Sequence, residues 1–198
     1  MSNYEMSNYI EIRNANSIVT INDDYQNLSF VKKQNGNEII NSYHFIEIDS
    51  RIGVAAITAS SPNVKICRPD QCRVRVKNGD GNLVGQVLEV ASGIEEKNSI
   101  NIYYFDYANK ADGTVGIIVY NSKMEVVYNS NLKYLKILDI VTTAGTYHYS
   151  NKIAVFYHGN WHKDWSGIKG YLRFPSEYSF ELDLDPNVPV VVADIDGL

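Results

Sequence analysis

The stretch YIEIRNANSIVTINDDYQNLSFV, Tyr9–Val31, occurs a second time in this chain of 198 residues. Its counterpart, GIIVYNSKMEVVYNSNLKYLKIL at Gly116–Leu138, matches it without a gap at a constant offset of 107 (121 − 14 = 107). The identical positions are Ile10, Asn14, Val19, Asn22 and Leu28 in the first copy, and Ile117, Asn121, Val126, Asn129 and Leu135 in the second. Because apolar positions and turn asparagines coincide, we interpret the stretch as one β-module present twice.

Each copy has the pattern of a short β-meander. Tyr9–Arg13 alternates apolar with polar residues and ends at an asparagine turn, Ser17–Ile21 is the return strand, and Leu28–Lys32 follows as a third strand. Further along, Ile52–Thr58 is a continuous apolar run, which predicts a central strand buried on both faces. Ser99–Tyr107 predicts another strand, rich in aromatic residues.

Weaker echoes extend the repeat beyond the meander. Tyr43-His44-Phe45 is similar to Tyr147-His148-Tyr149, and Arg51–Val54 is similar to Lys152–Val155. Each half holds about seven short strands with turn residues every 8–12 positions, which is typical of a β-sandwich. We therefore predict an all-β chain of two tandem, related β-sandwich (immunoglobulin-like) modules at 9–110 and 114–198, after a leader at 1–8. Whether the modules share strands stays open.

Composition and charge exclude several classes of protein. The formal net charge of −5 argues against nucleic-acid binding, which requires a basic surface to neutralise phosphates. No run approaches the roughly 18 apolar residues of a membrane span, so we expect no membrane insertion. Met1–Arg13 has neither the basic region nor the apolar core of a signal peptide, and we expect cytoplasmic synthesis.

The two cysteines, Cys67 and Cys72, flank a four-residue turn, Arg68–Gln71. Residues that close such a turn lie opposite each other across a hairpin, so a Cys67–Cys72 disulfide is geometrically feasible. A cytoplasmic chain keeps its thiols reduced, however, and a zinc site would need two further ligands. Structural thiols are the first interpretation and a hairpin disulfide the second.

The most site-like stretch runs from His158 to Trp165, HGNWHKDW, and we predict that it forms a loop. One hypothesis is a glycan-binding surface, in which Trp161 or Trp165 stacks on a sugar ring and polar neighbours bind the hydroxyls. Its candidate ligand-binding residues are Asn160, Trp161, His162, Asp164 and Trp165. The structural alternative is that one tryptophan plugs the end of a sandwich. A metal site formed by His158, His162 and Asp164 is the least favoured alternative.

Catalytic and metal-binding motifs are missing from the sequence. Asp183–Asn187 has the spacing that opens a calcium loop, but Val188 occupies the position that requires glycine. No nucleophile elbow, phosphate-binding loop or zinc-protease motif is present. We therefore expect no catalytic residue, no metal, no cofactor and no enzymatic activity.

The second copy and the C-terminus carry a family resemblance. The segments GIIVYNSKMEVVYNSNLKYLKILDIV and VVVADIDGL resemble small phage and prophage proteins of uncertain function, encoded with siphophage tail-tip or tail-fibre genes. The matching patterns are Tyr120-Asn121, Tyr128–Ser130, Leu135–Val141 and Val192–Leu198. These are strand and turn patterns without a catalytic group, so the resemblance implies a family but transfers no functional residue.

Two hypotheses of function follow. The first is a structural or accessory component of a phage-like tail, which contacts tail-tip or tail-fibre proteins and is incorporated into the particle. The second is a lectin-like module for recognition of the host surface, which binds surface glycan through Trp161 and Trp165. The sequence does not determine the oligomeric state, and a homo-oligomer is compatible with either hypothesis.

Overall fold

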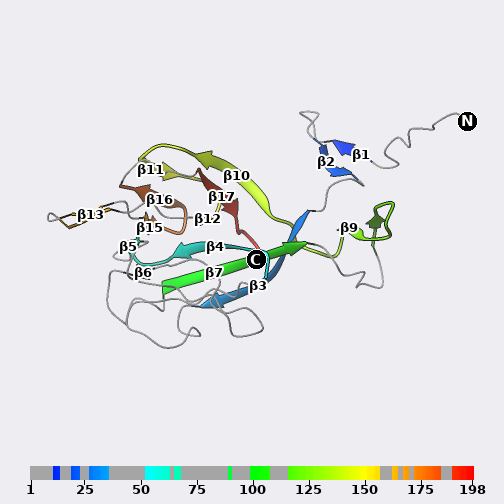
Figure 1. Ribbon diagram of the computed structural model, residues 1–198, viewed down its shortest axis with the longest axis horizontal. Coiled ribbons are helices and arrows are strands. Elements are labelled where there is room, and N and C mark those ends of the chain that lie inside the picture. Colours follow the sequence, from blue (N-terminus) through cyan, green and yellow to red (C-terminus); the bar gives the residue numbers. More distant parts are fainter. Residues whose placement is uncertain are drawn as a thin grey trace, which may run out of the picture. The chain divides into compact units, whose positions relative to one another are not determined.

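The chain forms two compact units, each described here by itself. The computed structural model describes residues 11–13, 19–22, 27–35, 52–62, 65–67, 89–90, 99–107, 116–156, 162–164, 167–169, 172–183 and 189–198. Unit 1 comprises Met1–Phe30 and Asp106–Leu135, and unit 2 comprises Val31–Phe105 and Lys136–Leu198. Within the described residues every regular element is a β-strand, so the all-β prediction is confirmed (Figure 1). The described part of the chain contains no helix long and apolar enough to span a membrane.

A six-stranded sheet forms the larger layer of unit 2, in the order β10-β17-β12-β4-β7-β3. Its strands are β3 (Leu28–Asn35), β4 (Val54–Ala59), β7 (Ile100–Tyr107), β10 (Lys136–Val141), β12 (Ile153–Phe156) and β17 (Val190–Asp194). The first residues of β3, 28–30, and the last residues of β7, 106–107, belong to unit 1. The two middle strands, β4 and β12, pair antiparallel with Ile57 opposite Val155. Strands far apart in the sequence therefore meet at the centre of this sheet.

A five-stranded antiparallel sheet forms the second layer, in the order β11-β16-β15-β5-β6. Its strands are β5 (Lys65–Cys67), β6 (Glu89–Val90), β11 (Gly145–His148), β15 (Leu172–Ser176) and β16 (Ser179–Leu182). A separate two-stranded hairpin, β13 (His162–Asp164) and β14 (Gly167–Lys169), completes the described strands of unit 2.

The two sheets bury one apolar core between them. On β15 and β16, Leu172 and Phe180 are completely buried, whereas Arg173 and Glu181 between the core positions are partly exposed and form an ion pair. This alternation is what a strand with one core-facing side requires. The core residues are Ile57, Ala59, Ile100, Ile102, Tyr104, Val141, Ile153, Val155, Leu172, Phe174, Phe180, Leu182, Val190 and Val192. Burying each large side chain contributes roughly 1.5–3 kcal/mol.

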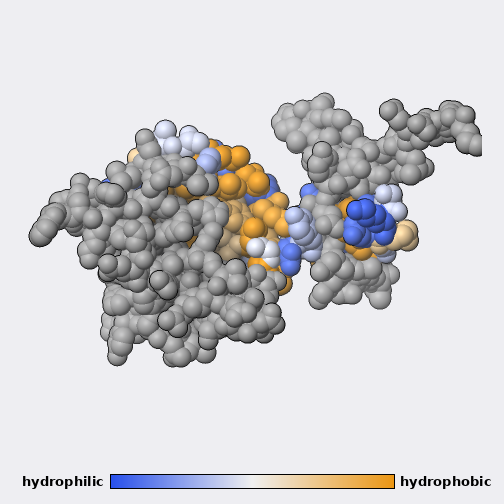
Figure 2. Space-filling view, viewed as in Figure 1, coloured by the Kyte–Doolittle hydropathy of each residue, from blue (hydrophilic) through white to orange (hydrophobic). Residues whose placement is uncertain are grey.

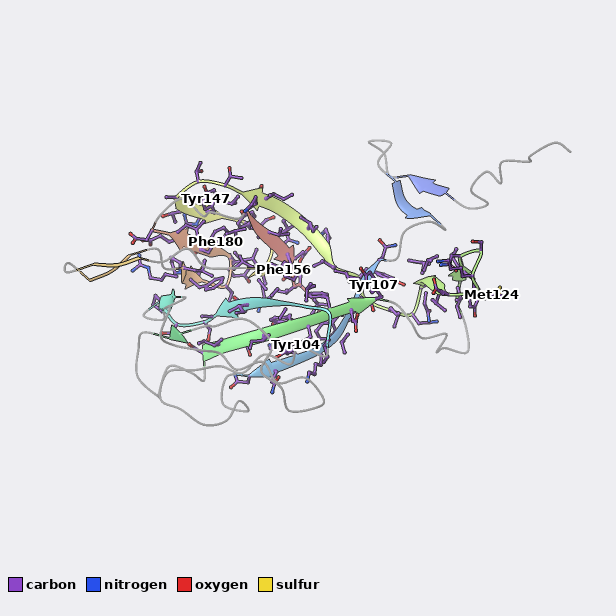
Figure 3. All side chains as sticks on the ribbon, in the orientation of Figure 1. Tyr104, Tyr107, Met124, Tyr147, Phe156 and Phe180 are labelled. Carbon is purple, nitrogen blue, oxygen red and sulfur yellow. The ribbon has the colours of Figure 1, made fainter. Side chains whose placement is uncertain are left out.

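Strand β4 has apolar residues on both of its faces. Ala56, Ile57, Thr58 and Ala59 are all buried, which confirms the sequence-based prediction of a central buried strand in this run. β4 lies between β12 and β7 within the sheet, so its backbone is paired on both sides. In Figure 3 the labelled Tyr104 lies on the neighbouring strand β7, and its ring belongs to the core.

The prediction of two tandem immunoglobulin-like modules, each with its own core, is not confirmed. The six-stranded sheet joins β3, β4 and β7, from residues 9–110, to β10, β12 and β17, from residues 114–198. The five-stranded sheet likewise joins β5 and β6 to strands of the second half. The physical reason is that a shared sheet satisfies the hydrogen bonds of β4 and β12, which two separate modules would leave at sheet edges.

Unit 1 contains the repeated hairpin twice. The first copy is β1 (Glu11–Arg13) with β2 (Val19–Asn22), and the second is β8 (Ile118–Tyr120) with β9 (Val126–Asn129). All four strands begin and end at positions related by the offset of 107 (118 − 11 = 107). The Cα registers also coincide, including a bulge at the third pair of each hairpin. The backbone pairing confirms the hairpin repeat that the sequence predicted.

The third segments of the two copies meet within unit 1. Ser29 and Tyr134 form an antiparallel bridge, flanked by two backbone hydrogen bonds. The amide of Phe30 donates to the carbonyl oxygen of Lys133 at 2.6 Å, and the amide of Leu135 donates to that of Leu28 at 2.8 Å. The repeated segments are therefore paired with each other.

Candidate functional site

The predicted glycan-binding residues lie only partly within the described chain. His162 and Asp164 belong to β13, which pairs with β14 through His162 opposite Lys169 and Asp164 opposite Gly167. The sequence predicted a loop here, whereas the structure places residues 162–164 in a strand. Asn160, Trp161 and Trp165 lie outside the described residues, as does His158. The glycan-binding site therefore stays a prediction.

Of the two cysteines in the predicted disulfide, the structure describes only Cys67. Cys67 is the last residue of β5, and its backbone lies opposite Glu89 of β6. Cys72 lies outside the described residues, so the Cys67–Cys72 bond stays a prediction. Within the described ranges, no group of three histidine, cysteine or carboxylate side chains is arranged to hold a metal ion.

A rigid turn at the tip of the β8–β9 hairpin presents an exposed methionine. The Asn121 side-chain oxygen accepts hydrogen bonds from the amides of Lys123 and Glu125, both at 2.9 Å. The amide of Met124 donates to the Asn121 carbonyl oxygen at 3.0 Å, which closes a turn of four residues. Met124 follows with a φ of 64°, a left-handed conformation that methionine rarely adopts. The turn holds a 75 % exposed apolar side chain at the tip.

Below this tip, a buried asparagine organises the end of the hairpin. Asn129 is completely buried, and its side-chain oxygen accepts hydrogen bonds from the amide and the side-chain nitrogen of Asn131. The Tyr134 hydroxyl accepts from the amide of Asn129 and donates to its carbonyl oxygen. Burial is the main cause that raises the pKa of Tyr134; the hydrogen bond with Asn129 lowers it and the nearby Tyr128 raises it. The hairpin base is thus held by polar contacts.

Exposed apolar side chains cluster on the described part of unit 1. Met124, Ile117 and Tyr120 belong to the β8–β9 hairpin or the residues just before it, and Ile117 is 64 % exposed. Tyr107, at the end of β7, is also exposed; Figure 3 labels Tyr107 and Met124. Scattered apolar residues are normal on a protein surface, so these exposures by themselves assign no function to unit 1.

Strand β10 carries a second exposed apolar surface, in unit 2. Ile137 and Ile140 are 54 % and 58 % exposed, although β10 also contributes the buried Val141 to the core. Figure 2 shows hydrophobic surface along this part of unit 2. Within the described strand order, β10 is an end strand of the six-stranded sheet, and a bulge interrupts its pairing with β17 between Ile137 and Asp139. We call Ile137 and Ile140, with the backbone of β10, the β10 surface.

Fixed polar groups frame the β10 surface. Lys136 donates to a carboxylate oxygen of Asp194 at 2.6 Å, and the side chain of Asn151 donates to the same oxygen at 2.9 Å. The carboxylate of Asp139 accepts hydrogen bonds from the Tyr149 hydroxyl and from the amide of Ile140. These contacts hold charged groups in place beside the two isoleucines.

The same contacts shift two pKa values. Burial by itself would raise the pKa of Asp194, but hydrogen bonds from Lys136, the amide of Asp196 and Asn151, with the charge of Lys136, hold that pKa below its ordinary value of 3.8. The pKa of Tyr149 is raised, first by burial and then by its hydrogen bond to the negatively charged Asp139. At neutral pH, Asp194 is a carboxylate and Tyr149 a neutral donor.

Sequence reasoning did not single out the exposed residues of the two surfaces. Asn121 was identified as a turn residue, but no signal marked Met124 as the residue in the left-handed position. Leu135–Val141 was identified as a strand pattern that carries the family resemblance, and such a pattern does not say which strand lies at a sheet end. The signal that the sequence of β10 offers is the charged residue that precedes each isoleucine, Lys136 before Ile137 and Asp139 before Ile140.

Comparison with known proteins adds no relative. No family model, no curated protein and no solved structure matches the chain.

Proposed function

We propose that this protein is a non-enzymatic structural or accessory component of a phage-like tail that acts through protein–protein contacts. The observation that carries the proposal is the β10 surface, where Ile137 and Ile140 are exposed on an end strand of the described sheet. The assignment to a tail comes from the sequence resemblance of Tyr120–Val141 and Val192–Leu198 to phage and prophage proteins.

The physical form of β10 favours contact with a folded partner over addition of a further strand. Its bulge and its charged residues Lys136 and Asp139 disrupt a regular edge, and such features protect sheet edges from unspecific pairing. An interface of this kind would bury the two isoleucines at its centre and leave the ion pair of Lys136 with Asp194 at its polar rim.

The proposal is tested in the cell that produces the protein. Tagged protein is purified after phage induction, and the co-purifying proteins are identified by mass spectrometry. We expect tail-tip or tail-fibre proteins with the wild-type chain, and their loss when Ile137→Asp and Ile140→Asp are combined. Tyr178→Asp, also at an exposed apolar side chain, is the matched control and should retain them. A wild-type chain recovered as a free monomer contradicts the proposal.

The glycan hypothesis gives a different result in the same system. Trp161→Ala with Trp165→Ala should leave incorporation into the particle unchanged if the protein acts through the β10 surface. Loss of glycan or cell binding in this double variant, with incorporation retained, would favour the lectin-like recognition module instead.

A further inference from the structure

In the six-stranded sheet, the strands of the first half and their counterparts in the second half follow the same order when each is counted from its own end of the sheet. Strand β10 is the repeat counterpart of β3, because Leu28 corresponds to Leu135. Strand β12 is the counterpart of β4, since Arg51–Val54 is similar to Lys152–Val155. The strands β7 and β17 are the last described strands of their halves. From each end, the order is therefore third strand, last strand, central strand.

Residue pairing supports these equivalences. Ile57 of β4 lies opposite Ile102 of β7, and Val155 of β12, which pairs with Ile57, lies opposite Val192 of β17. Both pairs are antiparallel. Ile102 and Val192 are thereby equivalent positions, and both belong to the apolar core.

The outer strands follow the same arrangement. Strand β10 runs antiparallel to β17. Beside β7, the side chain of Lys32 lies over the ring of Tyr104, and further along β3 the side chain of Asn35 donates to that of Asn101. From the first contact to the second, the residue number rises along β3 and falls along β7. Strand β3 therefore also runs antiparallel to its neighbour. Each half thus contributes an equivalent three-stranded ribbon.

Within each unit, the halves meet at a joint of the kind that a local two-fold axis in that unit would produce. In unit 2 the equivalent strands β4 and β12 pair antiparallel with each other. In unit 1 the joint is centred on equivalent residues, because the amide of Leu135 donates to the carbonyl oxygen of Leu28. Pairing of a position with its own counterpart is the signature of an isologous interface.

We propose that the two halves of this chain are mutual docking partners, and that the joint along β4 and β12 also accepts the corresponding half of a second copy of this chain. The contacts within one chain and between two chains are then identical, as in domain swapping. The covalent link raises the effective concentration of the partner half to the millimolar range, so the closed single chain dominates at low protein concentration. Cleaving that covalent link removes the preference for pairing within one chain over pairing between two chains.

The test introduces a site for a specific protease after Lys110 of the full chain, between the two halves. We expect the cleaved protein to elute from a sizing column as one species at the volume of the intact chain, with two bands on a denaturing gel. Tandem modules that fold separately would release two smaller species. Separation of the fragments under native conditions overturns the proposal.

A second measurement tests exchange between copies. Cleaved protein with an affinity tag on its first half is mixed with cleaved, isotope-labelled protein without a tag, at equal concentrations. We expect the tagged first half to acquire labelled second half until about half of its partners are labelled, as equivalent interfaces require. Uncleaved chains mixed in the same way should acquire none at low concentration. Absence of labelled second half after unfolding and refolding the cleaved mixture overturns the proposal.

Discussion

In unit 2, 14 buried residues from two sheets form one apolar core, whereas the described part of unit 1 is built around the buried polar side chain of Asn129. Unit 1 buries Val119, Val126 and Val127, but its hairpin is held largely by hydrogen bonds of Asn121, Asn129 and Tyr134. Apolar burial scales with the area removed from water, while a hydrogen bond contributes only about 1 kcal/mol net. Unit 1 should therefore open first.

The largest effect is expected in the core of unit 2. Phe174 is completely buried within the core, so Phe174→Ala should lower the free energy of unfolding by about 3–5 kcal/mol through lost burial and a cavity. Urea unfolding followed by circular dichroism measures this loss. Tyr178→Ala, at an exposed ring, should change the same quantity by less than about 0.5 kcal/mol. Equal losses in the free energy of unfolding for the two substitutions would contradict the assignment of Phe174 to the core and Tyr178 to the surface.

A smaller and local effect is expected in unit 1. Asn129→Ala removes the acceptor of two hydrogen bonds from Asn131 and should cost about 1–3 kcal/mol. Hydrogen exchange should become faster at the amides of β8 and β9 and stay unchanged at β12 and β17. Ser122→Ala, at the exposed tip, is the control and should leave both rates unchanged. Uniform acceleration across both units would show that they do not open separately.

Acid should weaken the contacts beside the β10 surface. Because the folded-state pKa of Asp194 is depressed, its contribution to stability is present above the unfolded-state value of 3.8 and is lost as pH falls through the lower folded-state value. Asp194→Asn should cost about 1 kcal/mol at pH 7, since Lys136 is largely exposed. The difference between wild type and variant, from urea unfolding across the acid range, should shrink below a pH of about 4. If the difference in the free energy of unfolding between wild type and variant is constant with pH, the lowered pKa of Asp194 is contradicted.

The smallest effect is a gain in stability at the hairpin tip. Met124→Gly places a residue without a Cβ at the φ of 64° and should stabilise the folded chain by about 0.5 kcal/mol, net of the entropy that glycine loses. Slower exchange of the Glu125 amide, which donates to Asn121, would report it locally. Met124→Ala keeps the strained conformation and serves as the control. Stabilisation by alanine equal to that by glycine would contradict a backbone origin.

Several elements of the fold could be predicted from local patterns. The hairpin repeat was readable because Asn14 and Asn121, with the apolar residues around them, recur at one offset, and turn residues determine where hairpins close. The buried strand β4 was readable because Ile52–Thr58 is a nearly continuous apolar run. The candidate site was harder to predict from the sequence. The exposure of Ile137 and Ile140 goes with the place of β10 at the end of the described strand order, and no local pattern gives that place.

The sequence by itself determined the all-β class, the hairpins at Asn14 and Asn121, and the repeat that relates the two halves, because strand periodicity and turn chemistry act over a few residues. Only the tertiary structure decided that the halves share sheets, with β4 beside β12. Pairing between strands about 100 residues apart depends on which edges and faces can be covered together, and no local pattern encodes that choice. The repeat therefore predicted the parts of this protein, and the shared sheet determined how they are joined.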